Sequence, residues 1–245
     1  MNRLMIAGVV LMFSTAFSGS TPKTPLNPSK IEEERSAVTA MMKPSFEEKI
    51  ATIYSDFTEK NESMPALTTF QHAMKGYYKL LEQGKVDKKI LTIIDFNLSS
   101  KIKRFWVLDM NTQDVLFNTY TAHGKNSGME FATSFSNSVN SHKSSLGFYV
   151  TGETYYGKNG LSLFIDGMEK GYNNNARKRY VVIHGSDYVN RNFISTRGRA
   201  GRSYGCPAIP RKLTRKVINI IKGKSVIFIN KSNEDYLEHS SYLNS

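Results

Sequence analysis

The hydrophobic pattern of this 245-residue chain changes near residue 89, and that change limits the folds available to it. Before it, apolar residues recur every three or four positions, which is typical of amphipathic helices. After it, short runs rich in Ile, Val, Phe and Tyr alternate with turn residues, which is typical of strands. The chain is therefore predicted to contain a small helical region followed by a mainly β domain.

The helical region is predicted over residues 31–84. Pro44 and Pro65 divide it, because proline breaks the interior of a helix. The resulting helical segments are residues 31–42, 45–58 and 66–83. In the last segment the apolar residues recur at helical spacing and predict a packing stripe, formed by Leu67, Phe70, Met74, Tyr77, Tyr78 and Leu81.

The β domain is predicted over residues 89–231, followed by a polar C-terminal tail over residues 232–245. Its strands are expected in residues 89–98, 104–109, 115–122, 147–153, 161–165, 180–184 and 225–229. Only residues 209–221 have clear helical character in this half. The pattern predicts a β-sandwich or partly open barrel with one helix packed against it.

The N-terminal residues have the pattern of an export signal. A positive residue precedes an apolar run from Leu4 to Phe13, and the small residues Ala16 and Ser18 fit a cleavage site. This run is too short to span a bilayer, and no later run is long enough. We expect residues 1–18 to be a signal peptide, residues 19–30 a linker, and the mature chain to be periplasmic or envelope-associated, without a transmembrane span. A buried helix or a retained anchor is the alternative.

The net charge of +12 favours polyanionic partners through long-range attraction. In an exported protein, such partners would be anionic polymers of the cell envelope. The basic run of residues 197–202 is also compatible with nucleic-acid binding. Export would remove that partner, so no nucleic-acid partner is expected.

Cys206 is the only cysteine in the chain. A lone thiol cannot form an internal disulfide and risks oxidation in an exported protein, so its presence indicates a chemical role. Pro207 suits the first position of a helix, which would place the thiol at a helix N-terminus and lower its pKa. Gly205 allows a tight turn and the approach of a substrate carbonyl. Backbone donors for an oxyanion would come from Tyr204, Gly205 or Cys206, because proline has no N–H.

A cysteine nucleophile usually needs an imidazole partner. Of the five histidines, His184 is our candidate, because it ends a strand-like run and is followed by Gly185. A core histidine that closes an apolar strand fits this position equally well. The sequence has no Cys-x-x-Cys motif, no His-Glu-x-x-His motif and too few clustered ligands for a metal site. We therefore expect no metal and no cofactor.

Two segments resemble a known family: Val182-Ile183-His184-Gly185 and Arg202-Ser203-Tyr204-Gly205-Cys206. Together they resemble the signature of the L,D-transpeptidase (YkuD-like) catalytic domain, which has an upstream His-Gly and a downstream Ser-x-Gly-Cys. The Gly-Cys-Pro-Ala form, and further motifs between residues 135 and 179, resemble its murein L,D-transpeptidase branch. The resemblance covers about residues 90–230 and leaves out the helical region.

The resemblance implies a β-rich domain that makes or remodels peptidoglycan and takes its stem peptides as substrates. The Cys206 thiolate would attack the carbonyl between an L-centre and a terminal D-residue of a tetrapeptide stem. His184 would take the thiol proton and give it to the leaving amine. An amine acceptor would then resolve the acyl-enzyme. The backbone carbonyl of Gly185 would orient the histidine ring.

One position departs from the family pattern. Many members have an arginine two residues after the cysteine, where it helps to bind the donor, but this chain has Ala208 there. Arg197, Arg199 and Arg202 precede the motif in the same loop, and the sequence leaves open which of them replaces it. We assign Arg202 to substrate binding.

Other site assignments depend on proximity to these motifs. Ser203 is expected to support the cysteine loop or the thiolate, although a simple turn residue fits equally well. Tyr156 and Ser186 are assigned to substrate binding. Tyr156 and His123 are candidates to line the cleft. A role in the core or on the surface fits each of them at least as well.

Two other functions are compatible with the sequence. An L,D-carboxypeptidase or endopeptidase would use the same site with water as the acceptor, and acceptor choice depends on the shape of the cleft. The second alternative function is that of a non-catalytic module, which would bind the envelope through its basic charge.

Overall fold

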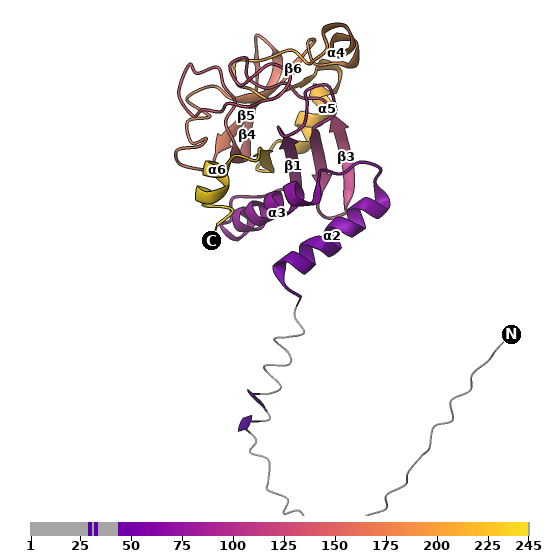
Figure 1. Ribbon diagram of the computed structural model, residues 1–245, viewed down its shortest axis with the longest axis vertical. Coiled ribbons are helices and arrows are strands. Elements are labelled where there is room, and N and C mark those ends of the chain that lie inside the picture. The colour runs from indigo at the N-terminus through magenta and orange to yellow at the C-terminus, as the bar shows by residue number, and fades with distance from the viewer. Residues whose placement is uncertain (1–28, 31, 34–43, 245) are drawn as a thin grey trace, which may run out of the picture. The chain divides into compact units, whose positions relative to one another are not determined.

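Within the described residues, one sheet of eight strands organises the fold (Figure 1). In chain order the strands are β1 (Ile90–Asp95), β2 (Phe105–Asp109), β3 (Asp114–Thr119), β4 (Gly147–Gly157), β5 (Gly160–Gly167), β6 (Val182–Ser186), β7 (Ala208–Pro210) and β8 (Val226–Asn230). Their order across the sheet is β3-β2-β1-β8-β4-β5-β6-β7. β1 pairs with β8 and β6 pairs with β7 in parallel, and the remaining neighbours are antiparallel.

The computed structural model describes residues 29–30, 32–33 and 44–244. The chain divides into two units, Met1–Pro44 and Ser45–Ser245, and the second contains the whole sheet. The predicted signal peptide, nearly all of the predicted linker and most of the predicted helix 31–42 lie outside the described residues. In the described part, no helix combines the length and the apolar character needed to cross a membrane.

Residues 121–125 bring one edge of the sheet back to the other. The N–H of Ala122 donates to the carbonyl of Ala208 in β7 at 2.9 Å, and the N–H of Ser203 donates to the carbonyl of His123 at 2.9 Å. Gly124 and Ser203 also form an isolated β-bridge. Because these residues continue from β3, the first strand of the sheet, to β7, the last, they nearly close it into a barrel. The prediction of a mainly β, partly open barrel is confirmed.

Two helices precede the sheet, as the apolar periodicity predicts. α2 (Phe46–Lys60) begins with a capping box between Ser45 and Glu48, and α3 (Leu67–Glu82) follows it. α3 contacts β1 and β8. A Cβ at Gly76 would lie 2.2 Å from the ring of Phe148 in β4, so glycine is required for this helix to approach the sheet.

A buried polar cluster fixes α3 to the middle of the sheet. The hydroxyl of Thr69 donates to one carboxylate oxygen of Asp95 at 3.0 Å, and the side-chain amide of Asn230 donates to the other at 3.1 Å. The same amide also donates to the Thr69 hydroxyl. These contacts join α3, β1 and β8, so the helix belongs to the same packed unit as the strands.

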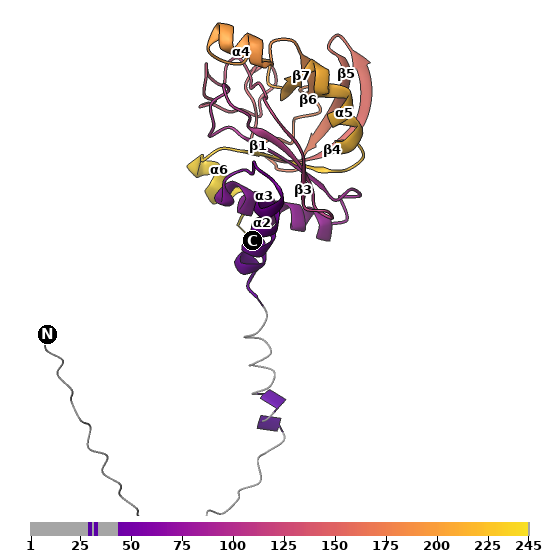
Figure 2. The same cartoon turned by 90° about the vertical axis from the view of Figure 1, so that its right-hand side faces the viewer.

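The end of the sheet opposite α2 and α3 carries α4 (Arg191–Arg197) and the β6–β7 pair (Figure 1 and Figure 2). α4 was not predicted. It begins at Asn190, whose side chain accepts a hydrogen bond from the N–H of Phe193, and it ends at Gly198 with φ of 68°. α5 (Arg211–Ile221) contacts β5, β6 and β7.

The predicted start of α5 at Pro207 is wrong. Residues 208–210 are extended and pair with β6, and the helix begins only at Arg211, after Pro210. A proline does precede the helix, but it is Pro210 and not Pro207. The strand expected at 180–184 is also displaced: β6 covers Val182–Ser186, and Tyr180 has φ of 52°.

The C-terminal residues fold against a buried carboxylate. Glu169 accepts hydrogen bonds from the N–H of Phe148 at 2.8 Å, from the hydroxyl of Tyr236 at 2.9 Å and from the hydroxyl of Ser240. Tyr236 is buried in α6 (Glu234–His239). Burial raises the pKa of Glu169, and the three donors oppose that rise. This carboxyl group therefore holds the C-terminal segment on the barrel.

We expect Glu169→Ala to destabilise the protein by about 3 kcal/mol or more, because it leaves buried donors without acceptors. The free energy of unfolding, from urea denaturation, measures this loss. Limited proteolysis should then cut the chain within residues 232–244. The matched control is Glu234→Ala, which removes an exposed carboxylate from α6. Equal stability of the two variants would contradict the anchoring role.

Candidate active site

β6 and β7 bring the two predicted reactive residues onto neighbouring segments. They pair in parallel with His184 opposite Ala208, so Cys206 lies two residues before the partner of His184. The thiol lies against the start of β6, where its Sγ donates to the carbonyl of Tyr180 at 3.4 Å and receives the N–H of Val182. Val182 and His184 are two residues apart on one strand, so their side chains share a face of the sheet.

The ring of His184 is buried and held by its neighbour. Its Nδ1 lies 3.1 Å from the carbonyl of Gly185. A carbonyl only accepts hydrogen bonds, so Nδ1 carries the proton and Nε2 has a free lone pair. Burial lowers the pKa of His184, with a further lowering from Arg211. The imidazole is therefore suited to accept a proton at Nε2 near neutral pH.

Gly185 also sets how closely α5 packs on β6. A Cβ at this position would lie 2.3 Å from the hydroxyl oxygen of Thr214 in α5. The sequence placed Gly185 just after a strand-like run that ends at His184. Instead it lies within β6, opposite Ile209, and allows the helix to approach the strand that carries His184.

The loop that carries Cys206 is folded around Ser203. The Ser203 hydroxyl donates to the carbonyl of Cys206 at 2.6 Å and accepts from the N–H of Gly205 at 3.0 Å. Gly205 has φ of 123°, and a Cβ there would lie 2.8 Å from the carbonyl oxygen of Lys143. Of the three N–H groups considered as oxyanion donors, that of Gly205 is thus occupied by Ser203, which leaves those of Tyr204 and Cys206.

The predicted lowering of the Cys206 pKa is wrong. No helix begins beside the thiol, because β7 separates it from α5. Burial raises the pKa of the Cys206 thiol, and the N–H of Val182 and the charge of Arg179 offset this rise only in part. In the free protein the thiol is therefore protonated at neutral pH. Among the described residues the thiol donates to the carbonyl of Tyr180 and makes no hydrogen bond with His184.

Arg179 is the cation beside the thiol, and the sequence did not single it out for this role. Its guanidinium donates to the carbonyls of Ser136 and Lys143, at 2.7 Å and 2.5 Å, and to the hydroxyl of Ser145. Burial lowers the pKa of Arg179, and the charge of Cys206 opposes that change. Its position ahead of β6 was visible in the sequence, but only the fold brings it to Cys206.

Arg202, which was assigned to substrate binding from the sequence, contacts the segment that follows β3. The guanidinium of Arg202 donates to the carbonyl of Lys125 at 2.9 Å and to that of Gly128 at 3.3 Å. Arg199 donates to the carbonyl of Ala200, and Arg197 lies on α4. Ala208, at the position where family members have arginine, is fully buried in β7. The assignment of Arg202 to substrate binding therefore stays a prediction, and its described contacts join the cysteine loop to the segment that follows β3.

His123 lies in the core and does not line a cleft. It is fully buried, with Nδ1 2.7 Å from a terminal nitrogen of Arg104 and Nε2 3.3 Å from the carbonyl of Gly128. Burial and the Arg104 charge lower its pKa to about 4. Arg104 is itself fully buried, donates to the carbonyls of Thr121 and Leu98, and has a pKa lowered by burial to about 9. The pair is a structural support behind residues 121–125.

The remaining assigned residues differ in exposure. Tyr204 is 68% exposed, with its ring centroid 4.6 Å from that of His142. Tyr156 is 70% exposed near the end of the β4–β5 hairpin. Ser186 is buried at the end of β6, where its hydroxyl accepts from the N–H of Tyr188 at 3.3 Å. Nothing in these contacts assigns a ligand to any of the three.

Tyr188 lies close enough to Cys206 for their charges to interact, and the sequence did not indicate this. Burial raises the pKa of its phenol, and the charge of Cys206 adds to that rise. A Cβ at Gly201 would lie 2.4 Å from its ring, so the loop before the cysteine packs directly on it. No motif or spacing distinguishes this tyrosine, because its place depends on the turn between β6 and α4.

The described residues contain no group of three or more His, Cys, Asp and Glu side chains arranged to hold a metal ion. The expectation of a reaction without metal or cofactor stays a prediction.

We expect alkylation of Cys206 by iodoacetamide to be slow at neutral pH and to accelerate only above the ordinary thiol pKa of about 8.5. The thiolate is the species that reacts, and a raised pKa moves its formation to higher pH. Mass spectrometry against pH measures the rate, and the single cysteine makes the assignment direct. Arg179→Met should move the curve further upward, whereas Arg179→Lys, which keeps the charge, should move it less. A rate that is already maximal below pH 7 would contradict this electrostatic description.

The comparison with known families identifies the domain. The profile of the L,D-transpeptidase catalytic domain matches residues 60–230. The match begins before β1 and includes α3, which the sequence resemblance left out. No curated protein sequence gives a significant match.

Several solved structures are similar to this one at low identity. An L,D-transpeptidase from Mycobacterium smegmatis is 10% identical, with a TM-score of 0.37 over 58% of this chain and 59% of its own. The helical cell shape determining protein Pgp2 from Campylobacter jejuni is 14% identical, with a TM-score of 0.39 over 66% and 57%. An L,D-transpeptidase from Enterococcus faecium is 13% identical, with a TM-score of 0.34 over 59% and 50%. The chain thus matches less than two thirds of the length of these proteins. On the extent of the profile match, this chain belongs to the L,D-transpeptidase catalytic domain family.

Proposed function

We propose that this chain is a peptidoglycan L,D-transpeptidase in which Cys206 is the nucleophile and His184 the general base. The observation that supports this most is the β6–β7 pairing, which brings Cys206 within two residues of the partner of His184. The hydrogen bond from Nδ1 to the Gly185 carbonyl supports it further, because it leaves Nε2 free to take a proton. Membership of the family supplies the substrate class.

The first step is acylation. The thiol turns from the Tyr180 carbonyl toward Nε2 of His184, which takes its proton while Sγ attacks the carbonyl carbon between the L-centre and the terminal D-residue of the stem. The carbonyl oxygen becomes an oxyanion, and the N–H groups of Tyr204 and Cys206 are the donors that we propose for it. His184 then gives the proton to the leaving amine as the C–N bond breaks, and a thioester remains.

The second step transfers the acyl group. An acceptor amine attacks the thioester carbonyl, His184 removes the proton from the attacking nitrogen, and the C–S bond breaks. The departing thiolate receives that proton from His184 and returns to its neutral form. The enzyme thus exchanges one amide bond for another and needs no co-reactant.

The resting pair is neutral, since burial raises the pKa of Cys206 and lowers that of His184. A charged pair therefore forms only while a substrate is bound and being attacked. The cation of Arg179 lies close enough to Cys206 to favour the transient thiolate. It is the charge that assists the nucleophile in place of the helix N-terminus expected from the sequence.

The site of action proposed is the cell envelope. The support is the N-terminal pattern of a signal peptide over residues 1–18 and a linker over residues 19–30, together with the net charge of +12, which favours anionic envelope polymers as secondary partners. Mass spectrometry of secreted or periplasmic material would test this by locating the mature N-terminus after about residue 18.

Incubation with a disaccharide tetrapeptide is the direct test of the activity. Wild type should form an adduct whose mass equals the enzyme plus the stem, less the terminal D-amino acid. Cys206→Ala should form no adduct and no product, and His184→Gln should slow acylation by roughly a hundredfold or more, as loss of a general base does. Ser55→Ala, an exposed hydroxyl on α2, is the control and should behave as wild type.

The products distinguish the functions. New cross-links between third residues of two stems show transfer, whereas shortened stems without links show hydrolysis by the same site. Absence of an acyl-enzyme from the folded wild type would overturn the proposal, and retention of cellular function by Cys206→Ala would favour a binding module.

Ser203 provides a second test, because it positions the nucleophile without touching the substrate carbonyl. Ser203→Ala removes the hydrogen bonds to the Cys206 carbonyl and the Gly205 N–H. We expect the acylation rate to fall roughly tenfold to a hundredfold, as small displacements of reacting groups do. Ser203→Thr keeps the hydroxyl and should restore most of the rate. Equal rates for the alanine variant and wild type would show that the loop holds its shape without this residue.

A further inference from the structure

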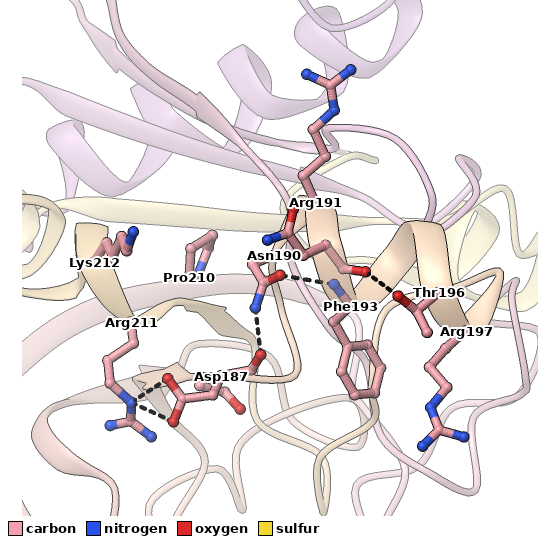
Figure 3. A pocket seen from close by; sticks show the side chains of 11 residues that line it. Asp187, Asn190, Arg191, Phe193, Thr196, Arg197, Pro210, Arg211 and Lys212 are labelled. Atoms are coloured by element: carbon pink, nitrogen blue, oxygen red, sulfur yellow. Dashed lines mark hydrogen bonds and ion pairs between the residues drawn. The ribbon is translucent and has the colours of Figure 1, made fainter.

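A cavity of about 660 Å³ lies beside the ends of β6 and β7 (Figure 3). Ser186, the last residue of β6, and Pro210, the last residue of β7, form part of its lining. The cavity therefore begins two residues beyond His184 and four beyond Cys206 along the chain. Its volume falls in the range of about 300–1,000 Å³ that is typical of ligand sites.

The lining of this cavity is strongly basic. Arg191, Arg197 and Lys212 line it, and no ion pair or hydrogen bond of their side chains exists among the residues that the structure describes. Figure 3 shows the contrast with Arg211, whose guanidinium pairs with Asp187 at 2.8 Å. Asp187 is the only acidic lining residue, and Arg211 neutralises it. Three positive charges are thus left to a ligand.

The spacing of the charges favours an extended ligand. Arg191 and Arg197 stand at the two ends of α4, six residues or about 9 Å apart along the helix axis. Lys212 comes from α5, on another side of the cavity (Figure 3). Three cations spread around an opening match separate anionic groups along a chain better than one small anion. Phe193 and Pro210 add apolar surface between them.

We propose that this cavity binds free carboxylates of the peptide stem that reaches the catalytic pair, an inference that rests on the proposed function. The Cys206 thiol lies beside Val182, and four residues of extended strand, about 13 Å, separate Val182 from Ser186, so a stem needs about four residues to reach from the reacting carbonyl into the cavity. Carboxylates pair with guanidinium groups through charge-assisted hydrogen bonds. Arg191, Arg197 and Lys212 are then specificity residues for acidic stems.

Binding to the full chain that carries Cys206→Ala tests this without turnover. Calorimetry compares a tetrapeptide stem with free carboxylates against the same stem with its carboxylates amidated. Adding Arg191→Gln, Arg197→Gln and Lys212→Gln should weaken binding of the free-carboxylate stem about tenfold or more. The amidated stem should bind weakly with or without these changes.

The matched control removes the same number of charges from exposed positions outside the cavity. Arg215→Gln, Lys216→Gln and Lys222→Gln lie on α5 and just after it and should change binding less than about twofold at physiological salt, where distant charges are screened. Equal weakening by the two triple variants would overturn the proposal, because general attraction would explain it. So would binding of the amidated stem as tightly as the free one.

A phosphate polymer is the competing occupant. If poly(glycerol phosphate) binds through Arg191, Arg197 and Lys212 while the stem peptide does not, the peptide assignment is overturned. Acylation by the wild type with the same stem is measured separately. If the wild type is acylated but the pocket variants bind the stem as tightly as the parent, only the proposal for the cavity is overturned. If binding depends on the pocket residues but no acyl-enzyme forms, only the proposed transpeptidase activity is overturned.

Discussion

The arrangement of the site depends on the hydrogen bonds that residues 121–125 make with the far edge of the sheet. β7 has only three residues, and it is held between β6 on one side and this segment on the other. Behind the segment lies the buried guanidinium of Arg104, which donates to the Thr121 carbonyl and the His123 ring and lies over the Phe96 ring at 4.9 Å. A buried cation is costly unless its donors are satisfied, so this support is stable only while the barrel stays closed. The hydrogen bonds that close the barrel therefore also fix the position of the Cys206 loop.

Much of the fold follows from the sequence because its elements are long and periodic. α3 has an apolar stripe, and the central strands β1 and β8 are almost continuously apolar, so their types are clear from local pattern. β7 was missed because three residues are too few to show any period. α4 was missed because its cap, Asn190, follows a polar turn rather than preceding an apolar run. α6 depends on Glu169, an acceptor far away in sequence, and no local pattern shows that.

The sequence likewise predicts only part of the candidate site. His184 and Cys206 are visible in the sequence because their neighbours have specific backbone requirements, such as the φ of 123° at Gly205. Their electrostatics are not visible, because the pKa of a thiol depends on what surrounds it in space. A helix start displaced by four residues, from Pro207 to Arg211, removed the expected dipole and left burial as the dominant influence. Arg179 and Tyr188 come near enough to interact with the charge of Cys206 only through tertiary packing, so no spacing rule identifies them.

The neutral resting state of Cys206 has a consequence for how the thiol survives in the cell envelope that we propose as its location. Peroxides and disulfides oxidise the thiolate much faster than the thiol, so a cysteine kept protonated is a poor target for them. The hydrogen bond from Sγ to the Tyr180 carbonyl favours the protonated form of the sulfur. An enzyme with a permanently ionised cysteine would need a reducing partner to stay active in an oxidising compartment. In the mechanism that we propose, a thiolate forms on this chain only in the brief interval in which substrate is bound, so its lone thiol would persist without such help.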